Sequence, residues 1–120
     1  MNIVQEILKM VDHSLLSPSL TDEQLKEGCA LAAQYHTASV CVKPYHVRQA
    51  VELLATTDVL VGAVISFPHG NSSIAIKAAE TEQVITDGAV EVDMVVNIGK
   101  VLSEDWNYID EELETIRKIT

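Results

Sequence analysis

The sequence predicts an α/β fold in which a parallel sheet is covered by helices. Short, almost wholly apolar runs recur at residues 38–42, 59–65 and 90–97, as expected for strands that are buried on both faces. Between these runs, apolar residues recur at helical spacing. Strands that alternate with helices in this way, about four times here, are typical of βαβ units. With 120 residues and no linker or low-complexity segment, we expect a single domain over residues 1–120.

The first half of the chain predicts two strands and three helices. A short amphipathic helix is expected over residues 3–11, and a short strand over 12–16 that ends before Ser17-Pro18. Thr21 and Gln24 have the spacing of a capping box and predict a second helix. Its buried side carries Leu25, Cys29, Ala32 and Ala33. The strand at 38–42 ends at Lys43-Pro44, and a helix with Val47, Ala50, Val51 and Leu54 on one side follows.

The second half predicts two more strands and their helices. The strand at 59–65 ends in the loop Phe67–Gly70, and Asn71 or Ser72 is expected to cap a helix that stops at Gly88. After the strand at 90–97, Asn97-Ile98-Gly99 is expected to form a loop. A final helix over about 105–120 should expose the acidic run Asp110-Glu111-Glu112. Its predicted buried residues are Trp106, Ile109, Leu113 and Ile116.

Composition excludes several classes of partner. A hydrophobic share of 48% with 22% charged residues is typical of a globular protein, and the net charge of −10 argues against nucleic acid or an anionic membrane. No apolar stretch is long enough to span a membrane, and no signal peptide is recognisable. The two cysteines do not suggest a disulfide framework, so we expect a reduced, cytoplasmic setting.

The carboxylate Asp93 is the strongest candidate for a chemical group, because it interrupts an apolar run. It could equally be a structural carboxylate. Glu91 should point to the same face and is favoured as a structural partner. Asp12 and Ser14 share a face of the first short strand, although a turn or helix-ending role is favoured for both.

Other polar residues favour unremarkable roles. Cys41 is a small hydrophobe unless it faces a pocket, and Lys43 is expected to be solvated. The four histidines lack metal-ligand spacing, so no metal or other cofactor is predicted. His69 lies in a loop that should face the site, where a solvated side chain is expected. No glycine-rich phosphate loop is present.

Four motifs, in order along nearly the whole chain, resemble the deoxyribose-phosphate aldolase family. They are Val11-Asp12-His13-Ser14-Leu15-Leu16, Ala38-Ser39-Val40-Cys41-Val42-Lys43-Pro44-Tyr45, Val64-Ile65-Ser66-Phe67-Pro68-His69-Gly70 and Asp87-Gly88-Ala89-Val90-Glu91-Val92-Asp93-Met94-Val95. The chain departs from the family at Val90, where a second acidic residue is usual.

The resemblance implies a class I aldolase on a TIM (β/α)8 barrel, of which this chain would form the first half. Such an enzyme cleaves 2-deoxy-D-ribose 5-phosphate reversibly to D-glyceraldehyde 3-phosphate and acetaldehyde through a lysine Schiff base, without a metal. In the family, the residue matching Asp93 belongs to the catalytic proton relay. The residues matching Asp12 and Ser14 help to orient substrate hydroxyls or water, and Cys41 matches a cysteine near the aldehyde site.

The Schiff-base lysine of the family lies on the sixth strand, in a Lys-Thr-Ser-Thr-Gly-Phe-like motif that is absent from these 120 residues. We therefore expect the isolated chain to be inactive. A half barrel would also leave open strand edges and an uncovered inner face. The sequence thus predicts association with a second copy or with a complementary C-terminal half. The alternative is a non-catalytic half-barrel that serves as a folding or interaction module.

Overall fold

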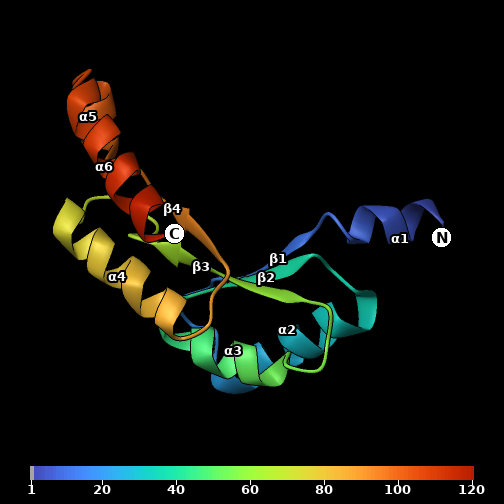
Figure 1. Ribbon diagram of the computed structural model, residues 1–120. Coiled ribbons are helices and arrows are strands. Elements are labelled where there is room, and N and C mark those ends of the chain that lie inside the picture. The colour runs from blue at the N-terminus through green and yellow to red at the C-terminus, as the bar shows by residue number, and fades with distance from the viewer. Residues whose placement is uncertain (1) are drawn as a thin grey trace.

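The structure, a computed structural model that describes residues 2–120, is a four-stranded parallel sheet with helices packed on one face (Figure 1). The strands lie in the order β1-β2-β3-β4, and each pairs in parallel with the next in sequence. Their bounds are β1 Asp12–Leu15, β2 Ser39–Val42, β3 Leu60–Ile65 and β4 Glu91–Met94. The predicted α/β fold and parallel sheet are therefore confirmed.

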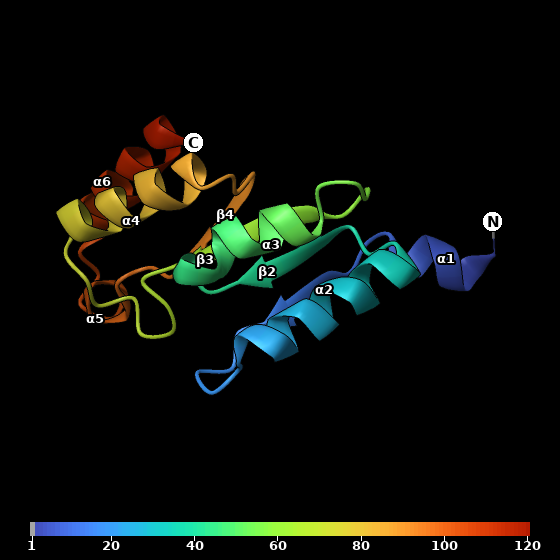
Figure 2. The ribbon, with the colours of Figure 1, turned by 90° about the horizontal axis from the view of Figure 1, so that it is seen from below.

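The helices follow the strands in alternation. They are α1 Ile3–Leu8, α2 Asp22–Tyr35, the short 3₁₀ helix η1 Pro44–His46, α3 Val47–Leu53, α4 Ile74–Thr86, α5 Ile98–Leu102 and α6 Trp106–Ile119. Seen from below, α2, α3 and α4 lie across one face of the sheet, and α6 lies beside α4 (Figure 2). The opposite face of the sheet carries no helix in either view. No helix in residues 2–120 has the length and apolarity needed to cross a bilayer.

The core lies between the sheet and the helices. Because side chains alternate along a strand, one set of strand residues points to the helices and the other to the uncovered face. The buried set on the helix side includes Leu15, Val40, Val42, Val61, Ala63 and Ile65. The helices contribute Leu25, Cys29, Val47 and Val84 to the same cluster.

Several local signals in the sequence are confirmed. Thr21 caps α2 in a full capping box, in which its Oγ1 accepts from the Gln24 amide at 3.1 Å and the Gln24 Oε1 accepts from the Thr21 amide at 2.9 Å. Gly88, just after α4, has a φ of +112°, which a residue with a side chain rarely adopts. The first helix is shorter than predicted, because the chain turns at Lys9–Met10 before β1 begins.

The prediction that strand 90–97 is buried on both faces is wrong. β4 stops at Met94, and its side chains alternate between exposed Glu91 and Asp93 and half-buried Val92 and Met94. Only one face of this strand meets the helices. Asp93 is therefore a carboxylate on an open face of the sheet rather than a buried one.

Two predictions about helix ends are also wrong. The segment Asn97-Ile98-Gly99 is not a loop, because Ile98 begins α5 and the Asn97 side chain caps it by accepting from the Lys100 amide at 3.0 Å. The N-cap of α4 is Ser73 rather than Asn71 or Ser72, and it makes no side-chain capping bond. At the start of α4, three polar residues in a row, Asn71, Ser72 and Ser73, could each cap the helix, so the sequence did not choose among them.

The predicted orientation of α6 is wrong in part. Ile109 and Ile116 are buried as predicted, but Trp106 and Leu113 are exposed and Glu112 is fully buried. Glu112 and Leu113 flank the same Ile109–Ile116 stripe on opposite sides, so periodicity alone could not choose between them. The acidic run is thus not wholly a solvated face, because Glu112 has a buried partner on α4.

Candidate functional site

Three predicted site residues converge on the uncovered face of the sheet. One oxygen or sulfur atom of each of Asp12, Cys41 and Asp93 lies within 4.8 Å of the others, although the residues come from β1, β2 and β4. The Cys41 thiol donates to Asp93 Oδ2 across 3.6 Å. The three residues are far apart in the sequence, so the sequence alone did not predict that they meet. Parallel pairing of the strands in this register brings them together.

Ser14 and Glu91 lie on the same face as the cluster. Ser14 is paired in register with Cys41, and Glu91 with Gly62. Asp12 and Ser14 both belong to β1, so the turn or helix-ending role that the sequence favoured for them is wrong. Ser39 was not predicted, yet its hydroxyl donates to Asp12 Oδ1 at 2.7 Å and orients that carboxylate. Its place two residues before Cys41, on the same face, was the available signal.

The thiol–carboxylate contact crosses the intervening strand β3, which lies between β2 and β4 in the sheet. In the row of residues that contains Cys41, the β3 position is Gly62. A Cβ at Gly62 would lie 3.3 Å from the Cβ of Glu91, which is a tight contact. Because Gly62 has no side chain, none projects from this position of β3, which lies between the strands of Cys41 and Asp93.

Burial and charge keep Cys41 protonated. The side chain is only 3% exposed, and burial, followed by the negative charges of Asp12 and Asp93, raises its pKa to about 12. A thiol in this state is a hydrogen-bond donor and not a nucleophile. It would also have to lose its proton to bind a metal, so only the two carboxylates offer ready ligands. The absence of a metal requirement stays a prediction.

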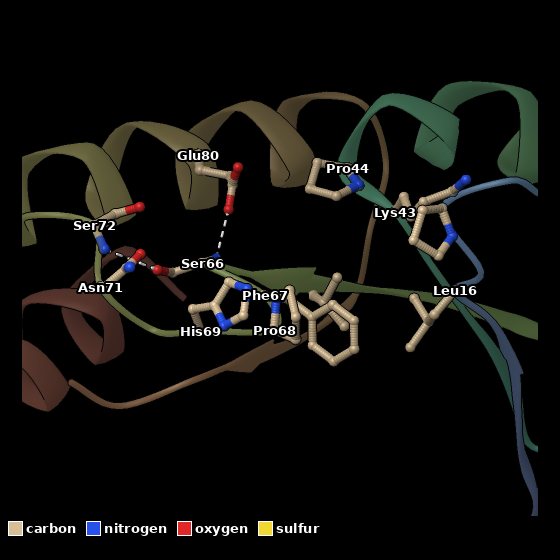
Figure 3. Close-up of a pocket in the computed structure, with 12 residues that line it drawn as sticks. Leu16, Lys43, Pro44, Ser66, Phe67, Pro68, His69, Asn71, Ser72 and Glu80 are labelled. Atoms are coloured by element: carbon tan, nitrogen blue, oxygen red, sulfur yellow. Dashed lines mark hydrogen bonds between the residues drawn. The ribbon is translucent and has the colours of Figure 1, made fainter. Parts of the chain in front are cut away.

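A pocket of about 620 Å³ opens at the carboxyl ends of β1, β2 and β3 (Figure 3). Its lining includes Leu16, Lys43, Phe67, His69 and Glu80. Val64, which is paired in register with Asp93, lines it too and connects the pocket with the carboxylate cluster. Chemistry in parallel β/α folds takes place at this end of the strands.

Some of the polar groups that line the pocket are hydrogen-bonded to each other. The Ser66 amide donates to Glu80 Oε1 at 2.7 Å, and Ser66 Oγ accepts from the Ser72 amide at 3.3 Å (Figure 3). Lys43 is half-buried rather than solvated. Its Nζ donates to the Ser17 carbonyl at 2.8 Å, and this hydrogen bond links the end of β2 to the loop after β1. His69 is exposed, as predicted. The pocket thus combines apolar side chains with a few polar ones, His69 and Asn71 among them.

Known proteins resemble this chain over nearly its full length. The family model of the DeoC/LacD family aldolases matches residues 6–120. Deoxyribose-phosphate aldolase of Rhodopirellula baltica is 46% identical over 115 residues, which are 96% of this chain and 48% of that protein. The enzyme of the same name from Clostridium tetani is 43% identical over 111 residues, 92% of this chain and 51% of that one.

Solved structures agree. A Coccidioides immitis protein has a TM-score of 0.94 at 34% identity, covering 98% of this chain and 47% of that one. QR15, an aldolase, has a TM-score of 0.91 at 32% identity, with 100% of this chain and 52% of that one covered. The chain thus spans about half the length of the relatives it matches, and its four β/α units correspond to half of their TIM barrels.

Proposed function

Because the chain belongs to the DeoC/LacD aldolase family, we propose that it forms the first half of a deoxyribose-phosphate aldolase. The reaction would be the reversible cleavage of 2-deoxy-D-ribose 5-phosphate to D-glyceraldehyde 3-phosphate and acetaldehyde in the cytoplasm. The convergence of Asp12, Cys41 and Asp93 on the open face of the sheet carries this proposal. In a closed barrel that face becomes the interior, next to the mouth where substrates bind.

The proposed chemistry runs through an imine between a lysine amine and C1 of the open-chain sugar, formed with loss of water. The imine nitrogen is protonated to an iminium. A base then removes the proton of the C3 hydroxyl, the C2–C3 bond breaks, and its electron pair moves into the iminium to give an enamine. Glyceraldehyde 3-phosphate leaves. Protonation of the enamine at C2 and hydrolysis of the imine then release acetaldehyde and restore the lysine.

Within this scheme, Asp93 is assigned the proton relay. An exposed carboxylate in an aqueous cavity can exchange protons with the sugar through a water molecule and can stabilise a neighbouring ammonium or iminium. Asp12, oriented by Ser39, and Ser14 are assigned to substrate hydroxyls or water. Cys41 donates to Asp93 and lines the aldehyde end without reacting.

The Schiff-base lysine is proposed to come from outside these 120 residues. Lys43, Lys77, Lys100 and Lys118 each have a hydrogen-bond or ion-pair partner away from the cluster. Lys9 follows α1, and Lys26 is exposed on α2, on the helix side of the sheet. The isolated chain is therefore expected to be inactive.

A partner would complete the barrel. Within residues 2–120, β1 and β4 each have one unpaired edge, and the uncovered face carries carboxylates that no helix covers. We propose that the chain pairs with a C-terminal half or with a second copy. The Aeropyrum pernix aldolase, 22% identical and with a TM-score of 0.82, is a tetramer, which shows that this fold supports oligomers. A folded monomer in analytical ultracentrifugation at micromolar concentration would contradict the proposal.

Borohydride trapping tests the reaction. The chain is incubated with deoxyribose 5-phosphate and borohydride, alone and with the C-terminal half of the Rhodopirellula baltica relative, and adducts are mapped by mass spectrometry. We expect no adduct on the chain alone and one on a lysine of the added half. An adduct on a lysine of this chain would contradict the assignment.

The second candidate is a non-catalytic half-barrel module. The observation that favours it is that Lys43, Lys77, Lys100 and Lys118 each pair with a group outside the carboxylate cluster. The absence of an adduct in both samples, although the two halves co-purify as a folded complex, would support this module over the aldolase.

A further inference from the structure

A fully buried ion pair joins α4 to α6, which lie side by side in both views (Figures 1 and 2). Lys77 of α4 and Glu112 of α6 are each 0% exposed, and the Lys77 ammonium donates directly to Glu112 Oε1. Lys77 lies between Ile74 and Thr81 along α4, and Glu112 lies beside the Ile109–Ile116 stripe of α6. The available sequence signal was one residue of opposite charge near the buried side of each helix.

The pair also holds the backbone that leaves β4. Lys77 Nζ donates to the Val95 carbonyl at 2.7 Å, and Glu112 Oε2 accepts from the Asn97 amide at 3.0 Å. Both backbone groups lie between β4 and α5, where neither strand nor helix satisfies them. The clamped segment begins two residues after Asp93. Its other side lies against Gly70 of the loop after β3, where no side chain fits.

Packing of α4 on α6 does not require these charges. The free energy needed to remove two charges from water offsets most of the free energy gained from their attraction. A protein with an apolar pair of similar volume in their place is therefore often as stable. Ile109 and Ile116 already supply buried apolar side chains on α6. What an apolar pair cannot supply is a donor for Val95 and an acceptor for Asn97.

We propose that Lys77 and Glu112 are positioning residues that fix the path of Val95–Asn97 and, through it, the Asp93 carboxylate beside Cys41. This role rests on the proposed aldolase function for its catalytic consequence. It excludes Lys77 as the amine that reacts with substrate, because its Nζ is enclosed and already donates to Glu112 and Val95.

The first test uses the chain itself. Lys77→Met and Glu112→Leu should each lower the denaturant midpoint, because each leaves one buried charge unpaired. The double variant Lys77→Met/Glu112→Leu should regain most of that loss. In its amide hydrogen exchange, however, the protection of Asn97 should fall about tenfold or more relative to the native chain, in line with loss of a hydrogen bond to a charged group. Lys118→Met removes an exposed pair on the same helix and should change neither quantity.

The second test uses the barrel completed with the C-terminal half of the Rhodopirellula baltica relative. The double variant should lower kcat by up to about 10²-fold, the cost of misplacing a group by about 1 Å, with KM little changed. A structural role alone would not lower kcat once the denaturant midpoint has been regained.

The outcomes separate the two proposals. Loss of Asn97 protection with a lowered kcat supports the positioning role. A double variant with native protection and native kcat overturns it, and one that does not fold assigns the pair to folding and overturns it as well. If the native complex shows neither turnover nor trapping, the aldolase proposal fails, while Asn97 exchange still decides whether the pair holds this segment.

Discussion

Gly70 should tolerate no side chain, and its replacement by alanine tests how tightly the loop after β3 and the exit of β4 are packed. Gly70 has a φ of +67°, in the left-handed region. A Cβ built on it would overlap the carbonyl oxygen of Val96 and would lie 2.8 Å from Val95 Cγ1 and 3.0 Å from the Val95 oxygen. Two of these three atoms belong to backbone, which cannot rotate away as a side chain can.

The cost of Gly70→Ala has two parts. The left-handed backbone disfavours a residue with a Cβ by about 1–2 kcal/mol. Displacing the packed Val95–Val96 backbone adds about 1–3 kcal/mol, as for other overpacked sites. The free energy of unfolding should therefore fall by about 2–5 kcal/mol, a large part of the stability of a small domain. At about 4 °C per kcal/mol, Tm should fall by roughly 8–20 °C.

Urea unfolding followed by circular dichroism measures the effect, and Gly99→Ala is the matched control. A Cβ at Gly99 would meet only the Asn97 side chain, at 3.5 Å, and Gly99 lies in α5, where alanine is favoured over glycine by up to about 1 kcal/mol. The control should be as stable as the native chain or more so. A loss below about 1 kcal/mol for Gly70→Ala, or equal losses for both variants, would refute the reasoning about this close approach.

Three further predictions concern the two cysteines and Asp93. Iodoacetamide at about pH 8 should modify Cys41 of the folded chain about a thousandfold more slowly than a free cysteine. The reason is that raising the pKa of the thiol from 9.0 to about 12 lowers its thiolate fraction by about that factor. Similar modification rates for Cys41 and free cysteine, measured by mass spectrometry, would contradict this. The pKa values of Cys29 and Cys41 are raised by burial to about 11 and about 12, so the folded chain keeps protons that the unfolded chain loses above pH 9.0. The free energy of unfolding should therefore fall as pH rises from 9.0 towards 12, and urea titrations should show a smaller fall for Cys41→Ala. In the completed barrel, Asp93→Asn should keep the native urea midpoint but lower turnover by about 10²–10⁴-fold, and normal turnover would remove Asp93 from the mechanism.

Much of the fold could be predicted because it depends on local patterns. Apolar runs and helical spacing located all four strands and the longer helices, and the Thr21–Gln24 spacing located the start of α2. Alternation along single strands also predicted that Asp12 and Ser14 share a face, as do Glu91 and Asp93. These features involve residues only a few positions apart, so they can be predicted from the order of residues along the chain.

The errors arose where a residue's environment depends on a distant segment. Asp93 was expected to be buried because its neighbours in sequence are apolar, but it is exposed on a face of β4 that no helix within residues 2–120 covers. Glu112 was expected in solvent because its neighbours are acidic, but Lys77 on another helix neutralises it. The neighbouring residues in the sequence do not predict the environment of either Asp93 or Glu112.

The sequence by itself determined the order of strands and helices, the faces of the strands and the family to which its motifs belong. Only the tertiary structure decided that Cys41 meets Asp93 over Gly62, that Ser39 orients Asp12, and that Lys77 and Glu112 hold the exit of β4. The physical reason is that periodicity orients a side chain relative to its own strand or helix. Contacts between strands and helices depend on register and packing across the whole sheet, which no single segment specifies.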